Sequence, residues 1–329
     1  MIRFLKLNDP FRLVVIFFLL LIIRLPFWLG DFPLLSPELT WMLIGEKMNE
    51  GLLLYRDFNA IIAPLSAFTY QVIDLFFGRS PIVYQVIAFL LLFIQGVIFN
   101  LQINKMMVLS EKTYLPAFIY SICGSFFFDM YTLSPVLLSL TFLLLALGEL
   151  FYVIKEGNSD ENSFYIGFYL GISILFFTPM IAFILVFLIG SLFYTNIYFK
   201  GYFILAFGVL FPFFLLFTFY YWRDGLPELL TNVFYYSLTQ STNFLLFYDI
   251  IMIVTIPILF VSIAILKVLN ATGFINYQVR IQSVMLFLLM MGVLILFFIP
   301  QLTMYHFLIF LPPICLLYTS DAADDSLRV

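Results

Sequence analysis

The chain has 329 residues, of which 64% are hydrophobic and 10% are charged, with a formal net charge of −4. This composition excludes a soluble globular domain, which could not cover its surface with so few polar residues, and it indicates an all-α, polytopic membrane protein. Long continuous apolar runs exclude a β-barrel, whose strands alternate in polarity. No basic cluster supports nucleic-acid binding, and two cysteines with one histidine form no metal-ligand spacing.

Taken in chain order, the apolar runs predict about ten membrane crossings. The first is a retained helix, since no small-residue cleavage site follows its apolar run. Arg24 lies near the far end of this helix, where we expect its side chain to extend to the membrane interface or to pair with a surface acid. A long run is divided into two short helices at Thr178-Pro179. The expected crossings are Leu13–Leu29, Pro81–Leu101, Leu115–Phe128, Leu133–Ile154, Phe164–Thr178, Pro179–Tyr194, Gly201–Trp222, Leu246–Lys267, Val284–Ile299 and Met304–Pro313.

Between the first two crossings, residues 35–80 hold the largest concentration of charge in the chain. We expect two amphipathic helices here that lie on the membrane surface. For the first, Ser36 suits the N-cap, Glu38 the first turn and Gly51 the stop. Its apolar face is expected to be Leu39, Met42 and Leu43. The second, from Pro64 to Gly78, is shorter than the roughly twenty residues needed to cross a bilayer.

Charge sets the expected orientation. With the N-terminus in the cytoplasm of a bacterial inner membrane, far more basic residues face inward than outward, in agreement with the positive-inside rule. Segments 35–80 and 223–243 then both face outward. The inner basic residues are Arg3, Lys6, Arg12, Lys105, Lys112, Lys155, Lys200, Lys267 and Arg280, and the outer ones are Lys47, Arg56, Arg79 and Arg223.

The last residues change abruptly from apolar to small and acidic. From Cys315 the chain reads CLLYTSDAADDSLRV, which resembles the conceptual translation of a transposase-type sequencing adapter. We therefore expect one transmembrane domain over residues 1–313 and a non-native tail over 314–329. An ordinary soluble tail is the alternative.

Several features in their order resemble the GT-C superfamily of membrane glycosyltransferases, which includes protein mannosyltransferases and the lipid A aminoarabinose transferase. The first helix ends in Arg24-Leu25-Pro26, and Pro37-Glu38 stands where the family begins a surface helix with an acidic pair. The step from Gly51 to Phe58 and the proline-led helix at Pro64 follow. Asp129 matches an acid in a short outer turn, and Tyr305-His306-Phe307 to Pro312-Pro313 matches an aromatic final helix.

The resemblance implies transfer of a sugar from a polyprenyl-phosphate donor to a cell-envelope acceptor. Such a transfer needs a carboxylate that deprotonates the acceptor hydroxyl, for which Glu38 is the first candidate and Asp57 the second. Where the family usually has an acid at the first position of its pair, this chain has Pro37, which puts catalysis in doubt.

The donor phosphate would need a cationic partner. Arg56, Arg79 and Arg223 are the candidates, because a guanidinium matches phosphate geometry. Asp129 could instead ligate a divalent cation, although no partner spacing supports one. His306 is a further candidate site residue, and membrane lipid is the expected surrounding.

Each of these residues also has a purely structural interpretation. Glu38 could complement a helix dipole, Arg56 and Asp57 could close a turn as an ion pair, and Asp129 could cap a turn. His306 could be a packed side chain. Two other functions therefore stay open: a non-catalytic membrane scaffold, and a lipid or solute transporter, although no helix carries a line of buried charge.

Overall fold

The computed structural model describes residues 9–30, 34–109, 111–195, 198–231, 276–296, 299 and 302–324. These ranges form α-helices and short 3-10 helices and no β-strand, which confirms the all-α prediction. The elements are α2 (Phe11–Leu29), α3 (Ser36–Asn49), α4 (Pro64–Phe77), α5 (Pro81–Met106), α6 (Leu115–Cys123), η1 (Phe128–Met130), α7 (Pro135–Glu156), α8 (Asp160–Phe176), η2 (Thr178–Ala182), α9 (Phe183–Tyr194), α10 (Phe199–Trp222), α13 (Asn276–Leu296), η3 (Met304–Phe310) and α14 (Leu311–Asp324).

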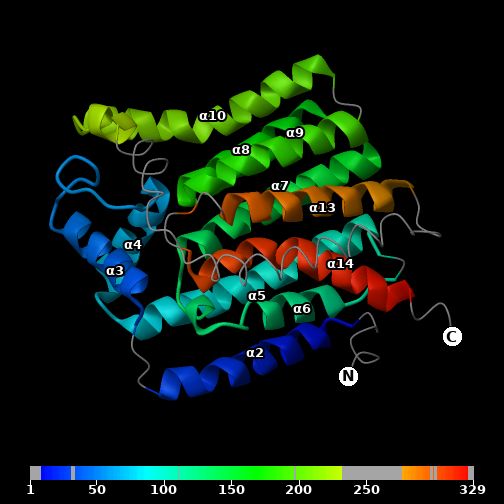
Figure 1. The fold of residues 1–329 in the computed structure, drawn as a ribbon, viewed down its shortest axis with the longest axis horizontal. Helices are drawn as coiled ribbons and strands as arrows, with labels where there is room; N and C mark the ends of the chain where they lie inside the picture. The colour runs from blue at the N-terminus through cyan, green and yellow to red at the C-terminus, as the bar shows by residue number, and fades with distance from the viewer. Residues whose placement is uncertain are drawn as a thin grey trace.

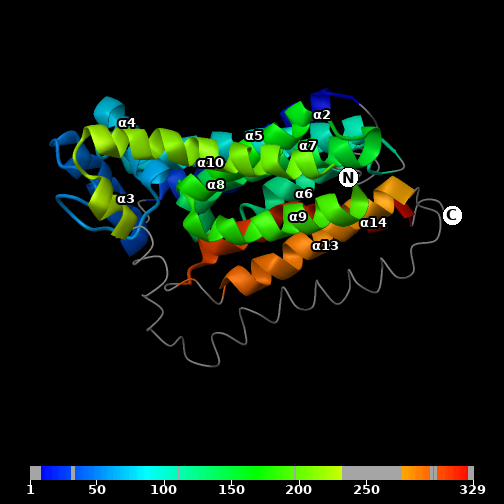
Figure 2. The same cartoon turned by 90° about the horizontal axis from the view of Figure 1, so that it is seen from above.

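Most helices lie side by side as a bundle, and α3 and α4 cover one end of it (Figure 1). The view from above agrees, with α3 and α4 again at one end (Figure 2). Polar contacts tie the opposite end together, where Tyr277 Oη donates to the Met107 carbonyl at 3.0 Å and Arg280 donates to the Tyr194 carbonyl at 3.3 Å. Because α3 and α4 are the helices of the charge-rich segment 35–80, this segment forms an end cap on the bundle, away from these contacts.

Five helices are long and apolar enough to cross a membrane, namely α2, α5, α7, α10 and α13. They support an integral membrane protein. The other apolar helices are shorter: α6 has 9 residues where we expected a crossing over Leu115–Phe128, α8 has 17 and α9 has 12. The expected crossing Leu246–Lys267 lies outside the described residues, so the count of about ten stays a prediction.

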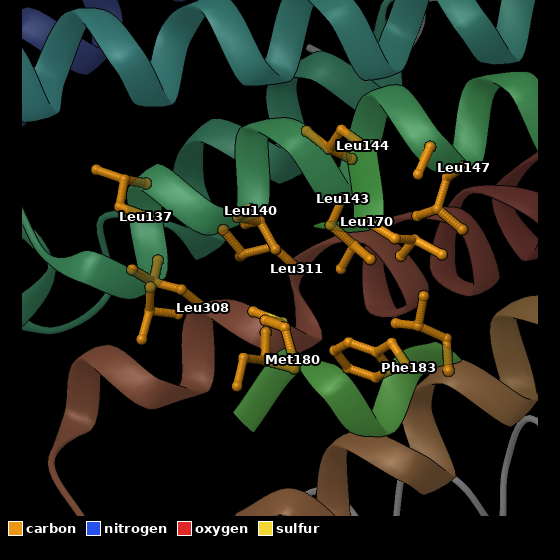
Figure 3. Close-up of a cluster of buried hydrophobic side chains, with 14 of the residues drawn as sticks. Leu137, Leu140, Leu143, Leu144, Leu147, Leu170, Met180, Phe183, Leu308 and Leu311 are labelled. Carbon is orange, nitrogen blue, oxygen red and sulfur yellow. The ribbon is translucent and has the colours of Figure 1, made fainter. Parts of the chain in front are cut away.

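Helix α7 runs through the centre of the bundle. Its Leu140, Leu143, Leu144 and Leu147 are fully buried. They meet side chains from α8, η2, α9, η3 and α14, among them Leu170, Met180, Phe183, Leu308 and Leu311 (Figure 3). Outer helices such as α10 instead expose Phe203, Phe207 and Phe214, as expected where the solvent is lipid.

The predicted division at Thr178-Pro179 is confirmed. Helix α8 ends at Phe176, and α9 begins at Phe183 after the short helix η2. Pro179 has no N–H to donate, and it sits in the first turn of η2, where that donor is not needed.

Helices α3 and α4 form over the two stretches that the sequence predicted to be helical between the first two long helices, and their place on a membrane surface stays a prediction. The first needs corrections. Leu35, not Ser36, is the N-cap residue, and the buried face of α3 holds Glu38, Trp41 and Gly45. Of the predicted apolar face, Met42 is buried against protein, while Leu39 and Leu43 are exposed. A helix at a bilayer surface can offer such side chains to lipid, so apolar character alone does not identify the face that packs on protein.

Helix α3 packs on α4 at backbone distance. A Cβ atom at Gly45 would lie only 2.7 Å from the carbonyl oxygen of Tyr70, so glycine is required there for the two helices to approach this closely. The chain leaves α3 through Gly51, whose φ of +94° is a left-handed conformation that favours glycine. The cap therefore forms one tightly packed helix pair.

Candidate functional site

Glu38 lies in the first turn of α3, on the side that faces the bundle. Its Oε2 accepts a hydrogen bond from the backbone N–H of Leu35 at 3.0 Å, and only 6% of the residue is exposed. This is the reciprocal half of a capping box, in which an acid at the third helical position satisfies the N-cap amide. The local sequence thus places the carboxylate at the base of the end cap.

Asp129 approaches Glu38 from η1, between α6 and α7. Its Oδ2 accepts a hydrogen bond from the backbone N–H of Met304 at 3.2 Å. Burial raises the pKa of Glu38, and the negative charge of Asp129 raises it further. The Leu35 N–H and the Thr132 hydroxyl act in the opposite direction, but the net shift is upward. The two carboxylates predicted from sequence therefore lie near enough for the charge of Asp129 to act on Glu38.

An aromatic wall adjoins these carboxylates. The ring of Tyr305, from η3, lies 5.2 Å from that of Trp41, which in turn lies 5.9 Å from that of Tyr70. Glu38 and Asp129 both contribute to the electrostatic environment of Tyr305. We call Glu38, Asp129, Thr132 and Tyr305 the Glu38 cluster. It combines a carboxylate of raised pKa with neutral hydroxyl groups, and such a carboxylate is a stronger base than an ordinary surface glutamate.

Arg24 corrects an expectation from the sequence. Its side chain does not extend to the membrane interface, since the residue has no exposed surface. The guanidinium donates to the carbonyls of Tyr131 and Met130, each at 3.2 Å, and lies 4.9 Å from the centroid of the Tyr131 ring. The turn after η1 offers these carbonyls, which is the reason the side chain points inward.

Asp57, the second candidate for the base, lies in a different group of residues. It pairs with Arg56 at 3.0 Å and accepts the N–H of Leu53 at 2.7 Å. The hydrogen bond from Arg56 is the largest cause of a lowered pKa at Asp57, and a carboxylate of lowered pKa is a weak base. The structural interpretation, an ion pair that closes the turn between α3 and α4, fits the observed contacts.

The three arginines proposed for phosphate do not gather at the Glu38 cluster. Arg56 Nη1 donates to the backbone carbonyl of Arg223 at 2.9 Å, which ties the α3–α4 connection to the end of α10. The Arg223 guanidinium lies 6.0 Å from the Phe219 ring. Arg79 forms an ion pair with Glu46. Of the segment 223–243, which was expected to face outward, residues 232–243 lie outside the described ranges.

His306 has a structural position. It is 2% exposed, and its Nδ1 accepts the backbone N–H of Thr303 at 3.1 Å, which caps the start of η3. Its ring packs 5.6 Å from that of Phe177. These contacts fit the interpretation of a packed histidine.

A divalent cation is not supported by a ready ligand set. Within the described ranges, no group of three or more histidine, cysteine or acidic side chains could hold a metal ion. Glu38 and Asp129 supply two carboxylates, so the cation stays a prediction.

Comparisons with protein-family models, curated proteins and solved structures give no match for this chain. The resemblance to the GT-C superfamily therefore depends on the sequence pattern alone. Sequence reasoning missed Thr132 and Tyr305 as neighbours of Glu38, and it misplaced Arg24. One signal could have corrected the last of these, since a charged residue inside an apolar span usually faces the protein interior.

Proposed function

We propose that this chain transfers a sugar from a polyprenyl-phosphate donor to a cell-envelope acceptor, with Glu38 as the general base. The observation that carries the proposal is the buried carboxylate of Glu38 at the base of the end cap, whose pKa is raised by burial first and by the charge of Asp129 last. At neutral pH such a group can still accept a proton from an acceptor hydroxyl. The site would face outward, with the N-terminus in the cytoplasm.

The donor would reach the site from the lipid side. Helix α4 exposes an apolar row that includes Phe68, Val72 and Phe76, next to its buried face against α3. An isoprenoid chain in the bilayer could lie along such a row while its phosphate reaches the outer end of the bundle. Phosphate recognition would fall to Arg56, Arg79 or Arg223, or to a divalent cation at Asp129, after rearrangement of their present contacts.

The test uses membranes from cells that express the full chain. Radiolabelled mannose and aminoarabinose on polyprenyl phosphate are supplied, and label in the envelope fraction is counted. Glu38→Gln keeps an oxygen acceptor for the Leu35 amide, because glutamine serves in a capping box, but it removes the base. Transfer should fall at least a hundredfold, which is within the usual contribution of general-base catalysis.

Glu50→Gln is the matched control. Glu50 lies at the exposed C-terminal end of α3, so this variant removes a carboxylate from the same helix without touching the cluster. A transfer rate in Glu38→Gln equal to that of the wild type would show that Glu38 is not the general base. Absence of transfer in the wild-type chain with both donors would remove support for this reaction.

A second candidate function is a non-catalytic membrane scaffold. The observation in its favour is that both carboxylates serve as helix caps, Glu38 for Leu35 and Asp129 for Met304. A scaffold predicts that Glu38→Gln, which retains the cap, co-purifies with the same partners as the wild type and restores a deletion strain as fully. Failure of Glu38→Gln to restore the deletion strain at normal protein levels would favour the enzyme.

A further inference from the structure

Arg24 is one of two arginines buried in the largely apolar helix α2. It has no exposed surface, while its neighbours Phe18 and Ile22 are 57% and 67% exposed on the outer side of α2. A guanidinium in such surroundings is costly unless it is well hydrogen-bonded, and residues of this kind face the interior of a helix bundle. Its position therefore calls for an explanation from its contacts.

The contacts of Arg24 are two consecutive backbone carbonyls. Nη1 donates to Tyr131 and Nη2 donates to Met130, each at 3.2 Å. None of the ion pairs among the described residues includes Arg24. The planar fork of a guanidinium can engage two acceptors at once, which a lysine ammonium cannot do with the same geometry.

The clamped carbonyls lie between two members of the Glu38 cluster. Asp129 directly precedes Met130, and Thr132 directly follows Tyr131. Asp129 accepts the backbone N–H of Met304 at 3.2 Å, and the ring of the next residue, Tyr305, lies 5.2 Å from that of Trp41 in α3. These contacts place the turn beside the helix that carries Glu38, and Thr132 is buried there. The turn has little helical structure to support it, because η1 spans only Phe128–Met130.

We propose that Arg24 is a positioning residue that ties the turn at Met130 and Tyr131 to α2 and so fixes Asp129, which borders this turn, beside the first turn of α3. The effect of Arg24 on catalysis rests on the proposed function, whereas its effect on the order of the turn does not. Hydrogen exchange measures the effect on the turn, and a transfer assay measures the effect on catalysis.

The first measurement is hydrogen–deuterium exchange of the full chain in lipid nanodiscs, followed by mass spectrometry. In Arg24→Gln, a peptide covering 125–134 should exchange at least tenfold faster than in the wild type, while peptides from the core of α7 stay unchanged and verify the fold. Arg12→Gln is the matched control, since Arg12 is another buried arginine of α2 near its opposite end. Should Arg24→Gln not fold, Arg24→Lys is measured, and a smaller increase confined to 125–134 is expected. Wild-type exchange over 125–134 in the folded variant would overturn the proposal.

The second measurement is the transfer assay. Arg24→Gln and Asp129→Asn should each reduce transfer at least tenfold, and the double variant should be no worse than Asp129→Asn alone, because both changes affect the same group. A double variant whose loss of transfer equals the product of the two single losses would mean that Arg24 acts independently of Asp129, and it would refute the positioning role. A wild-type chain without transfer would remove the proposed function, and the exchange measurement would still decide whether Arg24 holds the turn.

Discussion

The carboxylate of Asp129 accepts a hydrogen bond from the backbone N–H of Met304 at 3.2 Å, although the two residues are 175 positions apart. The contact joins η1, between α6 and α7, to the first residue of η3. The N–H groups at the start of a helix have no partner within it, so a carboxylate there supplies both an acceptor and a favourable charge.

Removal of that acceptor should loosen η3. We expect Asp129→Ala to lower the free energy of unfolding by about 1 kcal/mol, the usual cost of losing a helix cap. Asp129→Asn keeps an oxygen acceptor and should cost less than half as much. Denaturant titration of the detergent-solubilised chain measures both. Equal losses in the two variants would assign the effect to charge rather than to the hydrogen bond.

The raised pKa of Glu38 predicts opposite pH dependences for stability and for activity. The folded state holds the proton of Glu38 more tightly than the unfolded chain, whose value is near 4.5, mainly because the group is buried. Lowering the pH through the folded pKa should therefore increase the free energy of unfolding from this group, and raising it should decrease it. The neighbours that set the effect are Asp129, Thr132 and the Leu35 amide.

Transfer activity should follow the reverse course, because the base must be ionised. Activity should fall as the pH drops through a value above 4.5, and Glu38→Gln should remove the stability component. The check is to measure the free energy of unfolding and the transfer rate at the same series of pH values, from below 4.5 upward, in the wild type and in Glu38→Gln. An acidic limb at or below 4.5 would show that an unshifted carboxylate is the base.

The contact between α3 and α4 predicts a strong effect at Gly45. A methyl group there would lie 2.7 Å from the Tyr70 carbonyl, so Gly45→Ala must push the two helices apart and should cost about 1–3 kcal/mol. Gly96→Ala in α5 is the control, since its nearest neighbours would be at 3.4 Å, and glycine is a poor helix former. Thermal unfolding in detergent compares them, and a loss in Gly96→Ala as large as that in Gly45→Ala would contradict the packing argument.

Two stacked tyrosines should respond differently to loss of their hydroxyl groups. Tyr70 Oη donates to the Leu133 carbonyl at 2.6 Å, whereas Tyr84 Oη is buried without a hydrogen-bond partner. Their ring centroids lie 5.7 Å apart. Tyr70→Phe should cost about 1–3 kcal/mol because it leaves a buried carbonyl unsatisfied, and Tyr84→Phe should be neutral or stabilising. Denaturation of both variants tests this, and the reverse order would refute the assignment.

Proline and glycine positions in the sequence predicted several helix boundaries, in the end cap and in the bundle. Pro64 begins α4, the Thr178-Pro179 step separates α8 from α9, and Gly51 follows the end of α3. Proline and glycine act through their own backbone geometry, which depends little on the rest of the fold. The exact cap of α3 was missed by one residue, because an unusual N-cap, Leu35, is satisfied by the side chain of Glu38.

The partners of charged residues were less predictable. Sequence neighbours Arg56 and Asp57 do pair, as their proximity suggests. The contact of Asp129 with Met304 and the burial of Arg24 against Tyr131 instead involve segments far apart in the chain. Sequence patterns show that a charge sits in an apolar run. They do not show which distant carbonyl or carboxylate it will face.

By itself, the sequence determined that this chain is helical, apolar enough to enter a membrane, and supplied with a charged segment between its first two long helices. Composition and short-range patterns decide these properties, because each depends on a residue and its near neighbours. Only the tertiary structure decided that Glu38 is buried and that Asp129 caps η3, while Asp57 and three arginines make other contacts and Arg24 turns inward. Those outcomes depend on how helices pack, and packing is settled by close approaches such as that of Gly45 to Tyr70, which no local pattern records.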